Sequence, residues 1–174
     1  GEHAERAGLV IDLRGNPGGD FTVRRTIAEH LVDGSAIPWR YRGRRGVEEI
    51  RVDPAKPEVS CPVAILVDGL SASSAEELSG AMQALGRATI VGQRTAGLVL
   101  VADVVRLDIG ASLVVPVAET IFADDTVPEG RGIVPDVDVP YDIESLRRGV
   151  DPMLQAAVEA LAADRLSGSG VTGR

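Results

Sequence analysis

Apolar and polar residues follow one another along this chain in two patterns, one typical of buried strands and one of amphipathic helices. Two short, nearly uninterrupted apolar runs, residues 8–13 and 62–67, are typical of strands buried on both faces of a sheet. After each run comes a loop of small residues, and then a segment with the apolar period of a helix. Further strands are predicted at residues 36–42, 47–52, 89–91, 99–107 and 112–117.

Local signals predict where some of these elements begin. The first helix should span residues 21–32, with Val23 and Ile27 on its apolar face and Asp20 as its N-cap. Two of the strands should form a hairpin. Pro38 favours an edge position or a late start for the first of them, because proline cannot donate a hydrogen bond to a neighbouring strand.

The order of elements predicts a single α/β domain. We expect residues 1–164 to form its core, with residues 1–7 as the end of a helix that begins before this chain. A last helix should start at Pro152 after the N-cap Asp151. Residues 165–174 are rich in glycine and serine and should form a flexible tail.

Composition then narrows the classes of function. The 174 residues are 44% hydrophobic and 25% charged, which is ordinary for a globular domain. Only 3% are aromatic, so few side chains could stack on nucleic-acid bases. The formal net charge of -8 would repel a polyanion, so no nucleic-acid partner is expected. With Cys61 as its one cysteine, the chain cannot form an internal disulfide.

No cofactor, membrane span or signal segment is expected from the sequence. Two histidines and one cysteine offer none of the usual spacings of metal ligands, so we expect no metal and no organic cofactor. No apolar stretch approaches the roughly 20 residues that a membrane helix needs. A cytoplasmic location, and an extracytoplasmic one with a leader outside this chain, both stay open.

The two small-residue loops carry the candidate chemistry. They are Arg14–Gly19, with three glycines, and Leu70–Ser74, with three serines. Ligands gather at the carboxyl ends of parallel strands, where helix N-termini present free N–H groups, so these loops should face each other across one crevice. Acyl transfer needs an exposed hydroxyl, two N–H donors for an oxyanion, and a base.

Ser73 could supply the hydroxyl of such a site. The backbone N–H of Ser74, together with that of Gly18 or Gly19, could then bind the oxyanion. On the local sequence alone, serines that cap a helix and glycines that form a tight turn are the simpler interpretation.

Four segments in chain order resemble the C-terminal processing, or tail-specific, family of serine peptidases. They are GLVIDLRGNPGG at residues 8–19, VDGLSASSAEE at 67–77, ALGRATIVGQRTAG at 84–97 and EGRGIVPD at 129–136. The resemblance implies a ClpP/crotonase-like α/β spiral with a mixed sheet and flanking helices, acting on a peptide or unfolded protein. It implies that Ser73 is the nucleophile and that Ser74 and Gly18 or Gly19 donate to the oxyanion.

The sequence departs from this family at the general base. The family's lysine lies about 25 residues after the serine and its glutamine four residues later, positions held here by Leu98 and Ala102. Neither side chain can accept a proton, and Lys56 matches none of the motifs. The chain is similar rather to the tricorn-like branch, with its Ser-His-Glu chemistry. There Glu129 falls on the acid, whereas the histidine would precede Gly1.

Two functions stay open after this comparison. One is a serine endopeptidase domain that uses Ser73 and Glu129, with its base outside this chain and with His3 and His30 in structural or surface roles. The other is an inactive binding module for peptides or apolar ligands, like the retinoid-binding proteins that resemble the family. Residues 98–101 could line its pocket, although a buried strand is the simpler expectation. Acyl-CoA chemistry rests on fold analogy alone. Oligomerisation and substrate specificity stay open.

Overall fold

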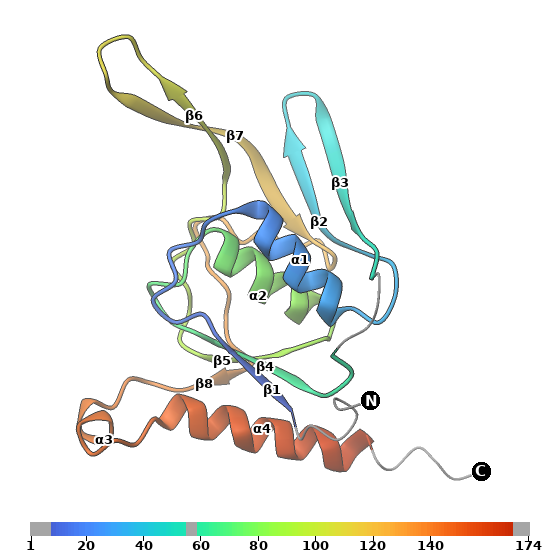
Figure 1. Ribbon diagram of the computed structural model, residues 1–174, viewed down its shortest axis with the longest axis vertical. Helices are drawn as coiled ribbons and strands as arrows, with labels where there is room; N and C mark the ends of the chain where they lie inside the picture. The colour runs from blue at the N-terminus through green and yellow to red at the C-terminus, as the bar shows by residue number, and fades with distance from the viewer. Residues whose placement is uncertain (1–7, 55–58, 169–174) are drawn as a thin grey trace.

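The described part of the chain folds into two four-stranded sheets and four helices (Figure 1). The computed structural model describes residues 8–54 and 59–168. The first sheet is parallel, in the order β1-β4-β5-β8, and its strands are β1 (Leu9–Asp12), β4 (Val63–Val67), β5 (Thr89–Gly92) and β8 (Val137–Asp138). The second is antiparallel, in the order β3-β2-β7-β6, and its strands are β2 (Ala36–Gly43), β3 (Gly46–Val52), β6 (Val101–Arg106) and β7 (Ser112–Phe122).

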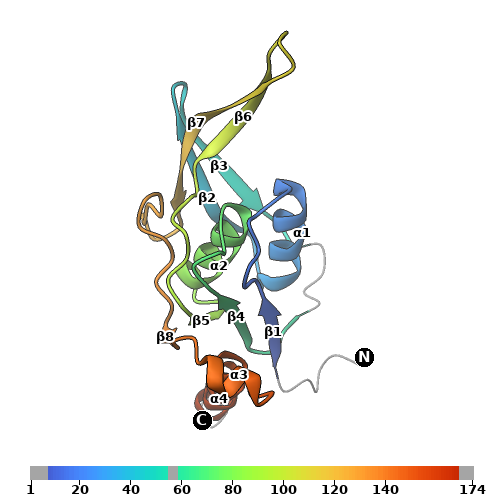
Figure 2. The ribbon, with the colours of Figure 1, turned by 90° about the vertical axis from the view of Figure 1, so that its left-hand side faces the viewer.

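The helices separate the two sheets and cover the far face of the first. They are α1 (Phe21–Leu31), α2 (Ser74–Ala84), the short α3 (Ile143–Arg147) and α4 (Pro152–Gly168). In both views α1 and α2 lie between the parallel and the antiparallel sheet, and α4 lies on the other side of the parallel sheet (Figures 1 and 2). The α/β class is confirmed, although the expected mixed sheet is divided into a parallel and an antiparallel one.

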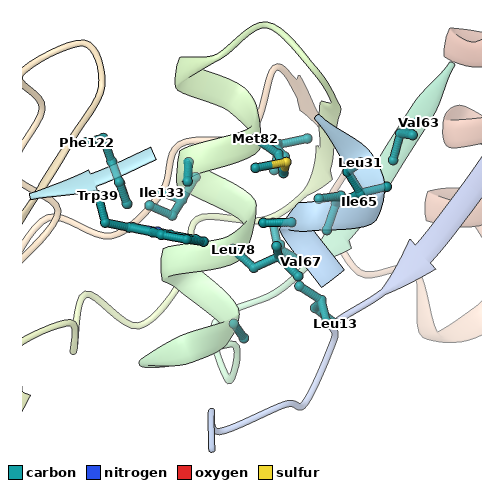
Figure 3. Close-up of a cluster of buried hydrophobic side chains, with 14 of the residues drawn as sticks. Leu13, Leu31, Trp39, Val63, Ile65, Val67, Leu78, Met82, Phe122 and Ile133 are labelled. Carbon is teal, nitrogen blue, oxygen red and sulfur yellow. The ribbon is translucent and has the colours of Figure 1, made fainter. Parts of the chain in front are cut away.

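Strand β4 is the centre of the core because both of its faces are buried. Alternate side chains point to opposite faces of a strand, and here Ile65 packs toward α1 and α2 while Leu66 packs toward α4. On the α1–α2 side, Trp39 and Phe122 of the antiparallel sheet close the cluster (Figure 3). The expectation of full burial is wrong for the first strand. β1 is an edge strand, and Asp12 at its end is exposed.

Two other expectations are corrected by the packing. Pro38 lies in β2, which is an interior strand between β3 and β7. The pairing with β3 shifts register between Ala36 and Trp39, so the proline sits in an irregularity where a missing N–H is tolerated. Val23 was expected on the apolar face of α1 but is 58% exposed, whereas Arg24 beside it is buried.

The two ends of the chain meet the expectations only in part. Asp20 caps α1 by accepting a hydrogen bond from Thr22 N–H at 2.6 Å, as predicted. Helix α4 continues to Gly168, four residues into the segment that we expected to be a tail. Residues 1–7, expected to end a helix, and the remaining tail, residues 169–174, lie outside the described part of the chain.

A hairpin of β6 and β7 projects from the body of the molecule (Figure 1). It carries a group of exposed apolar side chains: Val104, Val105, Leu107, Ile109, Leu113, Val114 and Val117. The other end of β7 enters the core, where Ile121 and Phe122 are buried. Among the described residues, no helix is long and apolar enough to cross a membrane.

Candidate active site

The two small-residue loops are joined side by side at the carboxyl edge of the parallel sheet. Their strands, β1 and β4, are hydrogen-bonded neighbours. Gly15 N–H donates to the Asp68 carboxylate at 3.0 Å, and the Ser71 hydroxyl donates to the Leu13 carbonyl at 2.8 Å. Burial tends to raise the pKa of Asp68, but hydrogen bonds from Gly15 and from the Tyr141 hydroxyl outweigh it and hold the pKa below its usual value. The loops therefore form one rigid unit.

Ser73 immediately precedes α2 and has an unusual backbone conformation. Its φ is 53° and its ψ is -121°, a region that non-glycine residues rarely occupy. Two contacts hold it there: Ser73 N–H lies 3.0 Å from the Leu98 carbonyl and 3.2 Å from the Glu76 carboxylate. Backbone strain of this kind is typical of functional sites, where the surrounding structure imposes it.

The glycine loop packs directly against Ser73. A Cβ atom added to Gly18, whose φ is 100°, would lie 2.6 Å from the Ser73 Cβ and 3.0 Å from the Ser74 nitrogen, so only glycine fits here. The Ser74 hydroxyl donates to the Gly19 carbonyl at 2.8 Å. Gly18, Gly19, Ser73 and Ser74 are therefore neighbours in space, as expected for two loops that face each other at one edge of the sheet.

The three candidate N–H donors differ in what they already bind. Gly18 N–H donates to the side chain of Asn16 at 2.9 Å. Within the part of the chain that the structure describes, the N–H groups of Gly19 and Ser74 have no acceptor. Of the two glycines, Gly19 is thus the better placed to pair with Ser74 in binding an oxyanion.

Glu76 is a fully buried carboxylate that joins the serine loop to the chain after β5. It accepts hydrogen bonds from the Thr95 hydroxyl at 2.5 Å, from Gly97 N–H at 2.7 Å and from Leu98 N–H at 2.9 Å. With the bond from Ser73 N–H, four donors surround this carboxylate, which satisfies a buried charge without a cation. Glu76 therefore fixes the extended segment that borders Ser73.

Glu129, the acid predicted to orient a histidine, binds the next part of the same segment. One of its carboxylate oxygens accepts hydrogen bonds from Val99 N–H at 2.7 Å and from Leu100 N–H at 3.1 Å. The expectation of a buried strand is wrong for two of the residues here. Leu98 and Leu100 are 63% and 36% exposed, and only Val99 between them is buried. A catalytic role of Glu129 stays a prediction.

The described residues bring no histidine or lysine to the loops that carry Ser73. His30 lies ten residues after the N-cap of α1, which places it about 15 Å along the helix from the glycine loop. His3 and Lys56 lie outside the described residues. Leu98 and Ala102, at the family's base positions, carry no basic group.

Sequence reasoning missed a buried ion pair beneath the site. Arg24 of α1 pairs with Glu77 of α2, and both side chains are almost fully buried. Arg24 also donates to the Tyr41 hydroxyl at 2.6 Å, and its guanidinium lies 4.2 Å from the Trp39 ring. A signal was present in the sequence. Arg24 is followed by apolar residues at i+3, i+4 and i+7, so it lies on the apolar face of the helix.

A small hollow lies between the N-terminal ends of α1 and α2, beside the free N–H groups. Its volume is about 150 Å³. Five of its lining residues are apolar: Leu13, Val23, Ile27, Ala75 and Leu78. The others are the two glycines and four polar residues: Asn16, Asp20, Arg24 and Ser74. Such a pocket suits one side chain of small to medium size.

Comparison with known proteins assigns the chain to a family. The model of peptidase family S41 matches residues 2–139, so the chain belongs to this family. The carboxyl-terminal-processing protease of Picosynechococcus is 34% identical over 161 residues, which are 90% of this chain and 38% of that protein. Carboxyl-terminal-processing peptidase 3, chloroplastic, of Arabidopsis thaliana is 31% identical over 165 residues, 94% of this chain and 32% of that protein. The resemblance read from the four motifs is confirmed.

Solved structures of the same kind share the fold. The photosystem II D1 C-terminal processing protease superposes with a TM-score of 0.70 at 29% identity, over 90% of this chain and 39% of that one. The tricorn protease superposes with a TM-score of 0.69 at 26% identity, over 91% of this chain and 15% of that one. The chain thus spans less than two fifths of the length of these relatives.

Proposed function

We propose that this chain is the nucleophile-bearing part of a serine endopeptidase that cleaves peptides or unfolded proteins. One observation carries the proposal. Ser73 is held in a strained conformation at the start of α2, in contact with Gly18 and beside the N–H groups of Ser74 and Gly19, which have no acceptor among the described residues. Membership of peptidase family S41 supports the same reading.

In the proposed reaction the Ser73 hydroxyl attacks a peptide carbonyl. The oxygen of that carbonyl becomes an oxyanion, and the N–H groups of Ser74 and Gly19 stabilise it; one such donor contributes about 10²- to 10³-fold in rate. The proton of the hydroxyl passes to a base, which we place outside this chain. Glu129 would hold that base in orientation, as the acid does in a catalytic triad.

The free side of the Glu129 carboxylate supports its part in this proposal. The backbone of residues 99 and 100 occupies one carboxylate oxygen. The second oxygen has no hydrogen bond within the described chain, so it can still accept one from an incoming imidazole. A Glu129→Gln variant should then lower turnover while the fold is retained.

Covalent labelling of the full-length protein tests the proposal. A fluorophosphonate probe, followed by peptide mapping, should label Ser73, and Ser73→Ala should abolish both labelling and cleavage of unstructured peptides, because an unactivated enzyme keeps only residual catalysis. Ser79→Ala is the matched control. Ser79 is buried in the same helix, bonds the Ala75 carbonyl at 2.8 Å, and lies away from the site. The Ser79→Ala variant should still take the label at Ser73.

The label also separates an enzyme from a binding module. A folded full-length protein that takes no label and cleaves no unstructured peptide would refute the peptidase and favour an inactive binding module of this fold. Label that requires a histidine from outside this chain would support the proposed origin of the base.

A further inference from the structure

The segment after β8, residues 140–151, ties α4 to the two loops of the candidate active site. It connects β8 to α4 and includes α3 (Figure 1). Two of its residues reach back to the loops. Tyr141 binds Asp68, which directly follows β4, and Asp151 binds Arg14, the first residue of the glycine loop. Both lie beyond residues 2–139, the part of the chain that the family model matches, and the proposed reaction gives neither a role.

Asp68 is the junction between the glycine loop, residues 14–19, and the serine loop, residues 70–74. The residue is only 3% exposed. One of its carboxylate oxygens accepts hydrogen bonds from Gly15 N–H at 3.0 Å, from Leu70 N–H at 2.9 Å and from Ser71 N–H at 3.0 Å. Because these donors come from both loops, a single carboxylate oxygen fixes the position of one loop relative to the other.

Tyr141 binds the second oxygen of the same carboxylate. Its hydroxyl donates to Asp68 at 2.7 Å, and this bond raises the pKa of the Tyr141 hydroxyl, so that Tyr141 stays a donor at neutral pH. Since Asp68 is almost fully buried, water could replace a lost donor only in part. The carboxylate could regain a donor only by turning, and turning would withdraw its first oxygen from the two loops.

Asp151 holds the beginning of the glycine loop. Arg14 makes a two-point contact with its carboxylate, with nitrogen-to-oxygen distances of 3.0 and 2.8 Å. The same carboxylate caps α4 by accepting a hydrogen bond from Leu154 N–H at 3.1 Å. A two-point contact between a guanidinium and a carboxylate sets orientation as well as distance. The start of α4 therefore fixes the position of Arg14.

The two loops transmit this restraint to the reacting atoms. Asn16 follows Gly15 in the glycine loop, and its carbonyl accepts a hydrogen bond at 3.0 Å from the N–H of Ala72, the residue before Ser73. A shift of the glycine loop therefore moves Gly19, the proposed oxyanion donor, relative to the Ser73 hydroxyl.

We propose that Tyr141 and Asp151 are positioning residues, which hold the two loops in register so that the N–H groups of Gly19 and Ser74 meet on one oxyanion. This inference rests on the proposed function. Oxyanion donors act at about 3 Å, and a misplacement of about 1 Å can lower a rate about 10²-fold. The carbonyl oxygen becomes an anion only as the reaction proceeds, so a displaced donor weakens the transition state more than the bound substrate. Loss of either residue should therefore lower kcat more than it changes KM.

Steady-state cleavage of fluorescein-labelled β-casein, an unstructured protein, by the full-length protein tests this role. Tyr141→Phe removes only the hydroxyl, and it should lower kcat about tenfold while KM changes by less than about twofold. Asp151→Ser keeps an N-cap for α4 but has no carboxylate for Arg14. It should lower kcat about threefold, because Asp12 still binds Arg14.

A matched control and a second measurement separate positioning from general stability. Thr89→Val removes a hydroxyl contact from the sheet to Asp164 of α4, 3.4 Å long, at the amino-terminal end of β5 and so at the opposite edge from the loops. Its kcat should stay within about twofold of the unmodified protein. Hydrogen exchange followed by mass spectrometry should show faster exchange of residues 14–19 and 70–74 in Tyr141→Phe, with β4 still protected. Thermal melts establish that each variant is folded at the assay temperature.

The results distinguish this inference from the proposed function. A folded Tyr141→Phe variant with unchanged kcat, or with unchanged exchange in both loops, would overturn the role of Tyr141. A higher KM at unchanged kcat, or an equal loss of kcat in Thr89→Val, would overturn it as well. Unchanged kcat in Asp151→Ser would overturn the role of Asp151 alone. If the unmodified full-length protein neither cleaves β-casein nor takes fluorophosphonate label at Ser73, the peptidase proposal fails, and the positioning role with it.

Discussion

Replacing Ser73 by glycine should make the protein more stable, although it removes the proposed nucleophile. The backbone of Ser73, with φ 53° and ψ -121°, is readily available only to glycine. A non-glycine residue in such a region costs about 1–3 kcal/mol. Glycine relieves this strain, but its greater freedom in the unfolded chain lowers the free energy of unfolding by about 0.4–1 kcal/mol.

The expected net gain is about 1 kcal/mol in the free energy of unfolding. For a domain of this length that corresponds to a rise of about 2–4 °C in Tm. Ser73→Ala keeps the strain, so it should change the free energy of unfolding by less than about 0.5 kcal/mol. Thermal and urea unfolding of the two variants, measured side by side, give this difference.

A control variant isolates the effect of the backbone conformation. Ala162→Gly introduces a glycine at an exposed position of α4 with ordinary helical geometry, and it should lower stability by about 1 kcal/mol. If Ser73→Gly is destabilised like this control, and falls below Ser73→Ala, then Ser73 is not strained and the reasoning is refuted.

Two further predictions concern carboxylates. Glu76→Gln should lower the free energy of unfolding by about 2–4 kcal/mol, because the amide NH₂ would face N–H donors that both carboxylate oxygens now accept from. Glu129→Gln should lower it by less than about 1 kcal/mol, because a single oxygen accepts both N–H groups there and the amide keeps one oxygen. Equal urea midpoints for the two variants would contradict this. The hydrogen bonds from Arg14 hold the pKa values of Asp12 and Asp151 below the usual value of about 3.9, against the opposing effect of burial. Their stabilisation is therefore complete above about pH 4 and is lost as the pH falls further. Urea unfolding from pH 7 to pH 2.5 should show this loss, and it should be smaller in an Asp12→Asn/Asp151→Asn variant.

The local parts of the fold were predictable from the sequence. The cap at Asp20, the hairpin of β2 and β3, and the burial of β4 each follow from a pattern within a few residues. The meeting of Ser73 with Gly18 also followed, because two parallel strands that each end in a small-residue loop bring those loops to one edge.

What could not be predicted depends on partners distant in the chain. The apolar spacing around Arg24 places it on the buried face of its helix, but no local pattern identifies its counter-charge, Glu77, which lies 53 positions later. Pro38 lies in an interior strand because β7 pairs with β2 from about 80 residues away. Leu98 is exposed because Glu76 and Ser73 hold its backbone in an extended segment beside the site instead of in a sheet.

The projecting hairpin of β6 and β7 has a consequence for the colloidal behaviour of the protein. Its exposed valines and leucines make the hairpin an apolar arm that can associate with the same arm of another copy, and β6 has an unpaired strand edge. What opposes contact between two such arms is the repulsion of chains that each carry a formal charge of -8. Near 1 M salt the screening length falls to about 3 Å, and near the isoelectric point the charge itself vanishes. Under either condition the attraction between arms goes unopposed, so concentrated solutions should stay dispersed best at neutral pH and low ionic strength.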